Sequence, residues 1–283
     1  MTAAMIGGIV AAATGGIAAI TAGLFRYGNG RLSVSRYTVT HPHLPAAFRG
    51  LRIVHLSDLH AASFGKRQER LLAHIDALAP DLVLITGDLI DRRRTADENG
   101  MRPALTLLEA LGARYPTMRV DGNHEPLSRV SALFHEKAAQ TPVLNVTNRA
   151  TAFTRDGETL TIVGVPDVAC FDYDETAWSE NMQRLTAPYQ DGCLITLSHR
   201  PQYLAAYAAA DLPLVLSGHA HGGQWRLPLV GGLFAPEQGV LPKYTAGIYR
   251  EGDTCMVVSR GLGNSGFPLR LFNRPDIVLL TLQ

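Results

Sequence analysis

The first half of the chain alternates short apolar runs with segments of helical spacing. Three apolar runs have the length of buried strands, at residues 51–56, 82–86 and 118–120. Three other segments repeat apolar side chains every three to four positions, at residues 68–78, 103–111 and 127–139. This β–α alternation predicts a parallel sheet with crossover helices.

The second half has more strand-like runs than helices. Strand-like runs occur at residues 160–165, 193–198, 214–217, 254–259 and 277–282. Helical spacing is found at residues 175–185 and 201–210. We therefore expect a second sheet, mostly antiparallel, that packs on the first in an α/β sandwich. Two loops rich in glycine or proline carry apolar residues, at 222–245 and 261–271.

The N-terminal segment is uncharged over residues 3–25, a length of 23 residues that can span a bilayer. The first charges after it, Arg26, Arg31 and Arg36, predict that the rest of the chain is cytoplasmic. A cleaved signal peptide and a buried helix of a soluble protein are the alternatives. The start of the segment lacks the positive side chains that are typical of a signal peptide.

The predicted organisation has three parts. Residues 1–26 form a transmembrane anchor, residues 27–50 a juxtamembrane linker or edge strand, and residues 51–283 the main folded domain. Small residues recur every fourth position in the anchor, at Gly7, Ala11, Gly15, Ala19 and Gly23. Such a ridge lets two helices approach closely, and it predicts a homodimer.

Composition limits the functions that the chain can have. Its formal net charge of +1 gives no general basic field for binding nucleic acid. The three cysteines form no CxxC pattern, and we expect them to be reduced and structural. With 283 residues, 46% of them hydrophobic, the chain is long enough for one large core.

Polar motifs stand at the ends of the strand-like runs. They are Ser57-Asp58-Leu59-His60, Gly87-Asp88, Gly122-Asn123-His124-Glu125 and Gly218-His219-Ala220-His221. Open α/β sheets place ligands where their strands end, so we expect these groups to meet at one site. Carboxylate, imidazole and amide donors without thiolate suit Mn²⁺, Fe or Zn²⁺. The sequence therefore predicts a metal centre.

Together with His199, these motifs resemble the full motif set of the calcineurin-like metallophosphoesterases, over residues 50–283. The resemblance implies a four-layer α/β/β/α sandwich that hydrolyses phosphate esters with two divalent metal ions, Mn²⁺ being the first expectation. It implies one metal on Asp58, His60, Asp88 and His221. It implies a second metal on Asp88, Asn123, His199 and His219, with Asp88 bridging. His124 would then be the histidine that donates a proton or a hydrogen bond to the scissile phosphate.

Substrate contacts are predicted less directly. Arg92, Arg93 and Arg200 are candidate phosphate contacts, since they follow the motifs closely, and Trp225 is a candidate contact in the first apolar loop. A solvated charged face is the alternative for the arginine run. The anchor and the C-terminal loop resemble a membrane-associated bacterial branch that includes a UDP-2,3-diacylglucosamine pyrophosphatase of lipid A synthesis. This implies a single-pass protein of the bacterial inner membrane. A general phosphodiesterase or phosphomonoesterase, and a non-enzymatic scaffold, are the alternatives.

Overall fold

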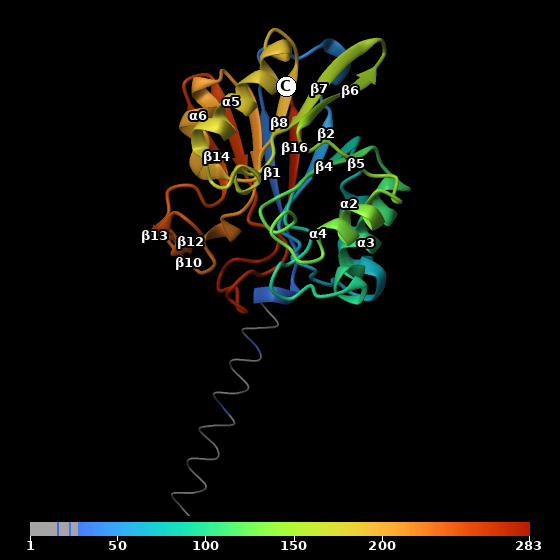
Figure 1. The fold of residues 1–283 in the computed structure, drawn as a ribbon, viewed down its shortest axis with the longest axis vertical. Coiled ribbons are helices and arrows are strands. Elements are labelled where there is room, and N and C mark those ends of the chain that lie inside the picture. Colours follow the sequence, from blue (N-terminus) through green and yellow to red (C-terminus); the bar gives the residue numbers. More distant parts are fainter. Residues whose placement is uncertain (1–15, 17–22, 24–27) are drawn as a thin grey trace, which may run out of the picture.

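Two six-stranded sheets lie face to face in a computed structural model that describes residues 16, 23 and 28–283 (Figure 1). The predicted anchor lies almost entirely outside these described residues. Within them, every helix is too short or too polar to cross a bilayer.

The first sheet has the order β1-β16-β2-β3-β4-β5. Its strands are β1 (Ser33–Val39), β2 (Arg52–Leu56), β3 (Leu82–Thr86), β4 (Thr117–Val120), β5 (Leu144–Asn145) and β16 (Asp276–Leu282). Strands β2 to β5 are parallel, as the β–α alternation predicts. β1 is an edge strand of this sheet.

Strand β16 does not belong to the second sheet, where we expected it. It lies between β1 and β2, parallel to the first and antiparallel to the second. Ile277 and Leu279 pack in the core beneath the first helices, while Val278 and Leu280 face the second sheet. An apolar run that is buried on both faces fits this inner position.

The second sheet has the order β14-β15-β9-β8-β7-β6. Its strands are β6 (Arg149–Arg155), β7 (Glu158–Gly164), β8 (Leu194–Leu197), β9 (Leu214–Ser217), β14 (Gly247–Glu251) and β15 (Thr254–Val258). The expectation of a mostly antiparallel sheet was wrong. The four central strands are parallel, and only the edge hairpins β6–β7 and β14–β15 are antiparallel. The helices between β7, β8 and β9 provide the crossovers that parallel pairing requires.

Helices cover the outer face of each sheet (Figure 1). α2 (Glu69–Ala77), α3 (Glu98–Gly112) and α4 (Ser131–Ala138) lie on the first sheet, and α5 (Glu175–Thr186) and α6 (Leu204–Ala209) on the second. α3 begins before the predicted start at Pro103, because the Asp97 side chain caps it by accepting a hydrogen bond from the Gly100 amide.

Three apolar cores separate four layers. In β2, Val54 and Leu56 face the first helices, while Ile53 faces the second sheet. In the second sheet, Val215 of β9 packs on the outer helices with Trp178 of α5. This is the predicted α/β/β/α sandwich. After β9 the chain forms two short hairpins outside the layers, namely β10 (Arg226–Leu227) with β11 (Gly231–Gly232) and β12 (Phe234–Ala235) with β13 (Gly239–Val240).

Candidate metal centre

The candidate ligands meet where strands of both sheets end. β2, β3 and β4 are paired in register up to Thr86 and Val120, so their following loops leave the sheet side by side. In the second sheet, β8 and β9 are paired up to Leu197 and Leu216, so the loops that follow these two strands also leave side by side. His199 Nδ1 donates a hydrogen bond to the carbonyl oxygen of Thr86 at 2.6 Å. This bond joins the loops of the two sheets.

All eight residues expected at the centre are buried, with exposed fractions from 0% to 7%: Asp58, His60, Asp88, Asn123, His124, His199, His219 and His221. Three groups among them place ligand atoms within 4.8 Å of one another. The groups are Asp58 with His60 and His221, Asp88 with His199 and His219, and His60 with Asp88 and His124. The first two groups hold six of the seven predicted ligands, without Asn123, and Asp88, which was expected in both sets, stands in the second group.

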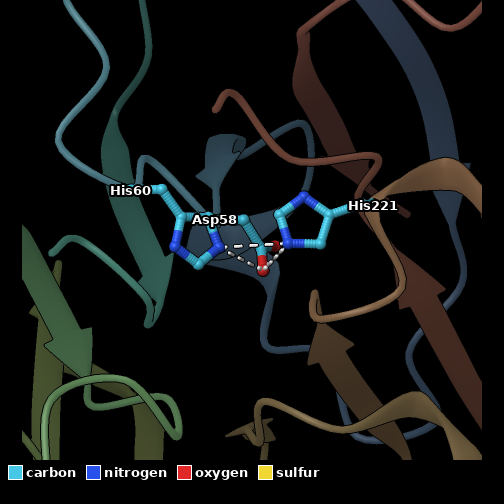
Figure 2. Close-up of side chains that lie close together, drawn as sticks. All are labelled: Asp58, His60 and His221. Carbon is cyan, nitrogen blue, oxygen red and sulfur yellow. Dashed lines mark hydrogen bonds and ion pairs between the residues drawn. The ribbon is translucent and has the colours of Figure 1, made fainter. Parts of the chain in front are cut away.

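The first group brings two imidazoles and a carboxylate together (Figure 2). His60 Nε2 lies 3.0 Å from His221 Nε2, and His221 Nε2 lies 3.5 Å from Asp58 Oδ1. Burial lowers the pKa of His221 to about 3 and holds the pKa of His60 well below its usual range. Both rings are therefore neutral at physiological pH, which is the form that binds metals.

The second group centres on the Asp88 carboxylate. His199 Nε2 lies 3.2 Å from Asp88 Oδ2, and His219 Nδ1 lies 3.2 Å from His199 Nε2. Burial alone would lower the pKa of His199, but the carboxylates of Asp88 and Asp58 raise it to about 10. The site thus favours positive charge between these groups, which a bound cation also supplies.

Asp88 lies between the two groups. Its Oδ2 is 3.6 Å from His60 Nε2 in the first group as well as close to His199 in the second. Burial alone would raise the pKa of Asp88, but the surrounding histidines, His199 above all, hold it well below its usual range. Asp88 is therefore an ionised carboxylate at the position expected of a bridging ligand.

Asn123 and His219 carry buried polar atoms that have no hydrogen-bond partner. They are the Asn123 side-chain oxygen and His219 Nε2. A buried acceptor without a partner is costly, and a metal ligand is one group that needs none in the protein. Together with the neutral imidazoles and the two carboxylates, the Asn123 oxygen fits a pair of divalent cations.

His124 differs from His199 in the partner of its Nδ1 atom. The backbone N–H of Arg92 donates to His124 Nδ1 at 3.1 Å, and an amide can only donate. The ring proton of neutral His124 is therefore on Nε2, which lies 4.0 Å from Asp88 Oδ2. His199 has the opposite arrangement, because its Nδ1 donates to a carbonyl. His124 thus presents a donor to the centre. His199 can present a lone pair at Nε2 only once that nitrogen has lost its proton, as it would when bound to a metal ion.

Five of the candidate ligands have left-handed backbone conformations. The φ angles are 53° at Asp58, 46° at His60, 55° at Asp88, 63° at His219 and 48° at His221. Residues other than glycine pay about 1–3 kcal/mol for such strained conformations, which cluster at functional sites. The surrounding loops hold this strain so that the side chains converge.

Glu125 ties the loop after β3 to the loop after β4, a role that the sequence did not predict. Its buried carboxylate accepts backbone hydrogen bonds from Asp88 (3.0 Å), Leu89 (2.6 Å), Ile90 (3.3 Å) and Gly122 (2.8 Å). The amide of Asp88 and the residue before Asn123 are thereby fixed to one side chain. Glu125 therefore positions ligands without being one.

Replacing Glu125 with Gln should destabilise the protein. The NH₂ group of Gln would face backbone N–H groups that now donate to a carboxylate oxygen. At least one of these buried N–H groups would then lose its acceptor. We expect a loss of about 2–4 kcal/mol in the free energy of unfolding, measured by urea denaturation. Exposed Glu109 of α3 offers a matched control, and Glu109→Gln should stay within about 0.5 kcal/mol of the wild type. Equal stability of Glu125→Gln and Glu109→Gln would contradict this role.

Arg200 is engaged by carboxylates in the structure. Its Nε and Nη2 donate to both oxygens of Asp167, at 2.7 and 2.8 Å, and its Nη1 donates to Glu237. Glu237 lies between β12 and β13, and its Oε2 is 3.9 Å from His219 Nε2. A phosphate contact by Arg200 stays a prediction, and it requires the substrate to share or displace Glu237.

Two further residues near the centre were not predicted. Asp91 Oδ2 lies 3.8 Å from His60 Nδ1, and Asp91 also pairs with Arg94. Arg270 is fully buried, and its Nη2 lies 3.3 Å from the His221 ring nitrogen that does not face His60. For Asp91 the spacing Gly87-Asp88-x-x-Asp91 was a usable signal. Nothing in the sequence linked Arg270 to His221, because 49 positions separate them.

The remaining substrate candidates lie at the rim. Arg92 contacts His124 through its backbone, and the Arg93 backbone N–H donates to Asp91 Oδ1 at 2.9 Å. Trp225 is 40% exposed, and its indole N–H donates to the Leu269 carbonyl oxygen at 2.9 Å. Substrate contacts by the side chains of Arg92, Arg93 and Trp225 stay predictions.

Comparison with known proteins agrees with this geometry. Residues 51–223 match the model of the calcineurin-like phosphoesterase family. The chain is 31% identical over 258 residues to an uncharacterized metallophosphoesterase, YkuE, of Bacillus subtilis, covering 89% of this chain and 86% of that protein. It is 28% identical over 237 residues to the phosphodiesterase YaeI of Escherichia coli, covering 82% of each.

A third relative is a bovine transmembrane protein with a metallophosphoesterase domain. It is 31% identical over 265 residues, and the match covers 89% of this chain but 57% of the bovine protein. With the family model matched across all eight candidate residues of the site, and the ligand groups assembled as described, the chain belongs to the calcineurin-like phosphoesterase family and is a phosphoester hydrolase.

Proposed function

We propose that this chain is a two-metal phosphoesterase that acts at a membrane surface on a phosphodiester or pyrophosphate bond. One observation carries the catalytic part, namely two buried ligand groups on either side of a single ionised carboxylate, Asp88. Two cations that lie close together need a shared anion between them, and Asp88 has the charge and the position. The donor set suits Mn²⁺ first, with Zn²⁺ and Fe as alternatives.

The proposed ligand sets use the groups described above. Asp58, His60 and His221 would hold one metal with Asp88, and Asn123, His199 and His219 would hold the other with Asp88. When bound, such a metal pair supplies charge neutralisation at the phosphate oxygens and acidifies a water molecule near phosphorus.

The protein side of the reaction rests on His124. Its Nε2–H is held toward the centre by the Arg92 backbone N–H at Nδ1, so the ring needs no rearrangement before it donates. We assign His124 the donation of a hydrogen bond from its Nε2–H to a phosphate or leaving-group oxygen, because transfer of the proton itself would need a ring protonated at both nitrogens and the Arg92 N–H occupies Nδ1. Burial lowers the pKa of His124, which keeps the ring neutral and the Nε2–H weakly acidic at physiological pH.

The membrane part of the proposal rests on the uncharged segment at residues 3–25. It is supported by the name of the bovine relative, which describes a transmembrane protein. The finer proposal is a substrate such as UDP-2,3-diacylglucosamine, whose pyrophosphate lies in the headgroup layer, with the catalytic domain on the cytoplasmic side of a bacterial inner membrane. The homodimer through the small-residue ridge stays a prediction, since the ridge lies almost entirely outside the described residues.

The second candidate is a phosphodiesterase of soluble substrates, which the name of the Escherichia coli relative favours. A non-enzymatic scaffold is disfavoured, because such a scaffold is expected to have lost ligands and all eight residues are present and buried.

The two enzymatic candidates differ in how turnover depends on residues 1–26. We expect the full-length protein to hydrolyse both bis-p-nitrophenyl phosphate in solution and UDP-2,3-diacylglucosamine in vesicles. Deletion of residues 1–26 should lower only the second activity, because an anchor raises the effective concentration of a membrane substrate. A constant ratio of the two activities would support the soluble-substrate enzyme. Cleavage of p-nitrophenyl phosphate alone would identify a phosphomonoesterase.

A further inference from the structure

Exposed apolar side chains gather on two loops beside the metal centre. Among the described residues, nine of the twelve exposed large hydrophobic side chains lie in residues 225–241 and 267–272. We call these nine the apolar loop surface: Trp225, Leu227, Leu229, Val230, Phe234, Val240, Leu241, Phe267 and Phe272. Leu229 is fully exposed, and Val240 is 77% exposed. Apolar groups concentrated in this way mark an interaction site.

The two loops are built into one surface. The Phe267 ring lies 6.2 Å from the Trp225 ring and 5.9 Å from the Phe234 ring, centroid to centroid, in edge-to-face contacts. The Trp225 indole N–H bonds to the Leu269 carbonyl oxygen, and the Arg226 backbone N–H donates to the Leu271 carbonyl oxygen at 2.9 Å. The exposed side chains therefore project from a hydrogen-bonded platform.

The N-terminal segment joins the body of the protein at this platform. Asn29 donates through its side-chain amide to the Pro268 carbonyl oxygen at 2.6 Å, and its side-chain oxygen accepts from the Arg270 backbone N–H at 2.9 Å. The 23 uncharged residues at 3–25 end four positions before Asn29. The described residue Asn29, four positions after this segment, is therefore fixed to one of the two loops that carry the exposed apolar side chains.

Basic side chains stand next to the same loops. Arg94 donates to the Asn264 carbonyl oxygen, and Arg93 Nη1 lies beside Gly266. Basic groups at the edge of an apolar surface suit the anionic headgroup layer of a bilayer, with apolar residues reaching the acyl boundary. The basic side chains and the apolar side chains thus both favour a lipid bilayer as the partner of this surface.

The surface is also continuous with a metal-ligand loop. Asn273 donates through its side-chain amide to the carbonyl oxygens of His221 at 2.7 Å and Gln224 at 3.0 Å. Trp225 follows directly. Anything that binds the apolar loop surface therefore also restrains the loop that carries His221, a candidate metal ligand.

We propose that the apolar loop surface lies in the headgroup region of a lipid bilayer, beside the entry point of the N-terminal segment, so that the metal centre is held at the headgroup layer. This deepens the membrane part of the proposed function and rests on it. The bilayer then acts as more than an attachment point, because it fixes the orientation of the catalytic domain.

Trp225 provides the test, because the chain has two tryptophans and Trp178 is buried in the core. The full-length protein is reconstituted into phosphatidylcholine–phosphatidylglycerol vesicles in which the acyl chains are brominated at shallow or deep positions. Emission from Trp225 is the difference between wild type and Trp225→Phe. We expect shallow bromines to quench this emission more strongly than deep ones, whereas Trp225→Phe alone should show little quenching.

Matched variants separate this surface from other exposed apolar residues. Leu229→Glu and Val240→Glu should lessen the quenching, while Leu144→Glu on β5 should leave it unchanged. Unquenched Trp225 in vesicle-bound wild type would overturn the proposal. Cross-linking between copies through position 229, with Trp225 unquenched, would assign the surface to a second copy instead. Hydrolysis of bis-p-nitrophenyl phosphate in every sample reports separately on the proposed catalysis.

Discussion

Replacing Asp88 with Asn should abolish most of the activity and remove metal from the protein. Asn keeps the shape of the side chain and an oxygen to accept the His124 backbone N–H, but it loses the negative charge between the two ligand groups. Stabilisation by metal ions amounts to several kcal/mol, so we expect kcat/KM to fall about 10³-fold or more. Metal analysis should show less than the two ions expected per chain.

The effect of Asp88→Asn should exceed that of Asn123→Ala, which removes a neutral donor from one group only. Asp156→Asn, on the exposed turn between β6 and β7, is a matched control and should retain both metal and activity. Normal metal content and kcat in Asp88→Asn would mean that Asp88 does not bridge the two groups.

The second large effect is expected for His124→Ala, which should keep the metals and lose rate. The ring donates from Nε2 and is held through Nδ1, so its removal deletes a donor to the substrate and leaves both proposed ligand sets intact. Removing one hydrogen-bond donor to a developing negative charge costs about 10²–10³-fold, and we expect kcat to fall within that range. Steady-state kinetics and metal analysis on the same preparation measure both quantities.

The structure also shows the rival arrangement that this variant can detect. His60, Asp88 and His124 place ligand atoms close enough to hold an ion by themselves. If His124→Ala loses metal in proportion to activity, His124 is a ligand and the assignment as a donor is wrong.

That the candidate ligands lie together was predictable, because these residues follow strands directly. The run at residues 82–86 is a buried strand, and the parallel pairing that its pattern implies brings Asp88 beside the loops that follow β2 and β4. A sandwich of two covered sheets was also predictable, since inner strands such as β3 and β9 are apolar enough to be buried on both faces.

Other features depend on contacts between distant parts of the chain. β6 and β14 carry partly exposed, polar sequences, and pairing with a hairpin neighbour makes them strands. The inner position of β16 is set by pairing with β1 and β2, which lie more than 220 positions earlier. The clamp made by Glu125 needs the Asp88 loop to be in place, so no local pattern reveals it. In each of these examples the structure depends on contacts with distant residues, which the local sequence does not show.

Two buried arginines show the same limit. Arg200 stands directly after a candidate ligand, which favoured a phosphate contact, yet Asp167 and Glu237 approach its guanidinium from separate segments. Arg270 lies in an apolar loop and is buried against carbonyl oxygens of Arg260 and Gly263. A charged residue in a sequence gives no sign of which backbone oxygens will surround it.

Titration of the metal-free, full-length protein with Mn²⁺ tests the two-metal centre most directly, with hydrolysis of bis-p-nitrophenyl phosphate followed at each addition. We predict no turnover without metal and a rise to a maximum at two equivalents per chain, the number that two ligand groups sharing Asp88 can hold. Full activity in the metal-free protein, or a maximum at one equivalent, would contradict a centre built from two cations and a shared carboxylate.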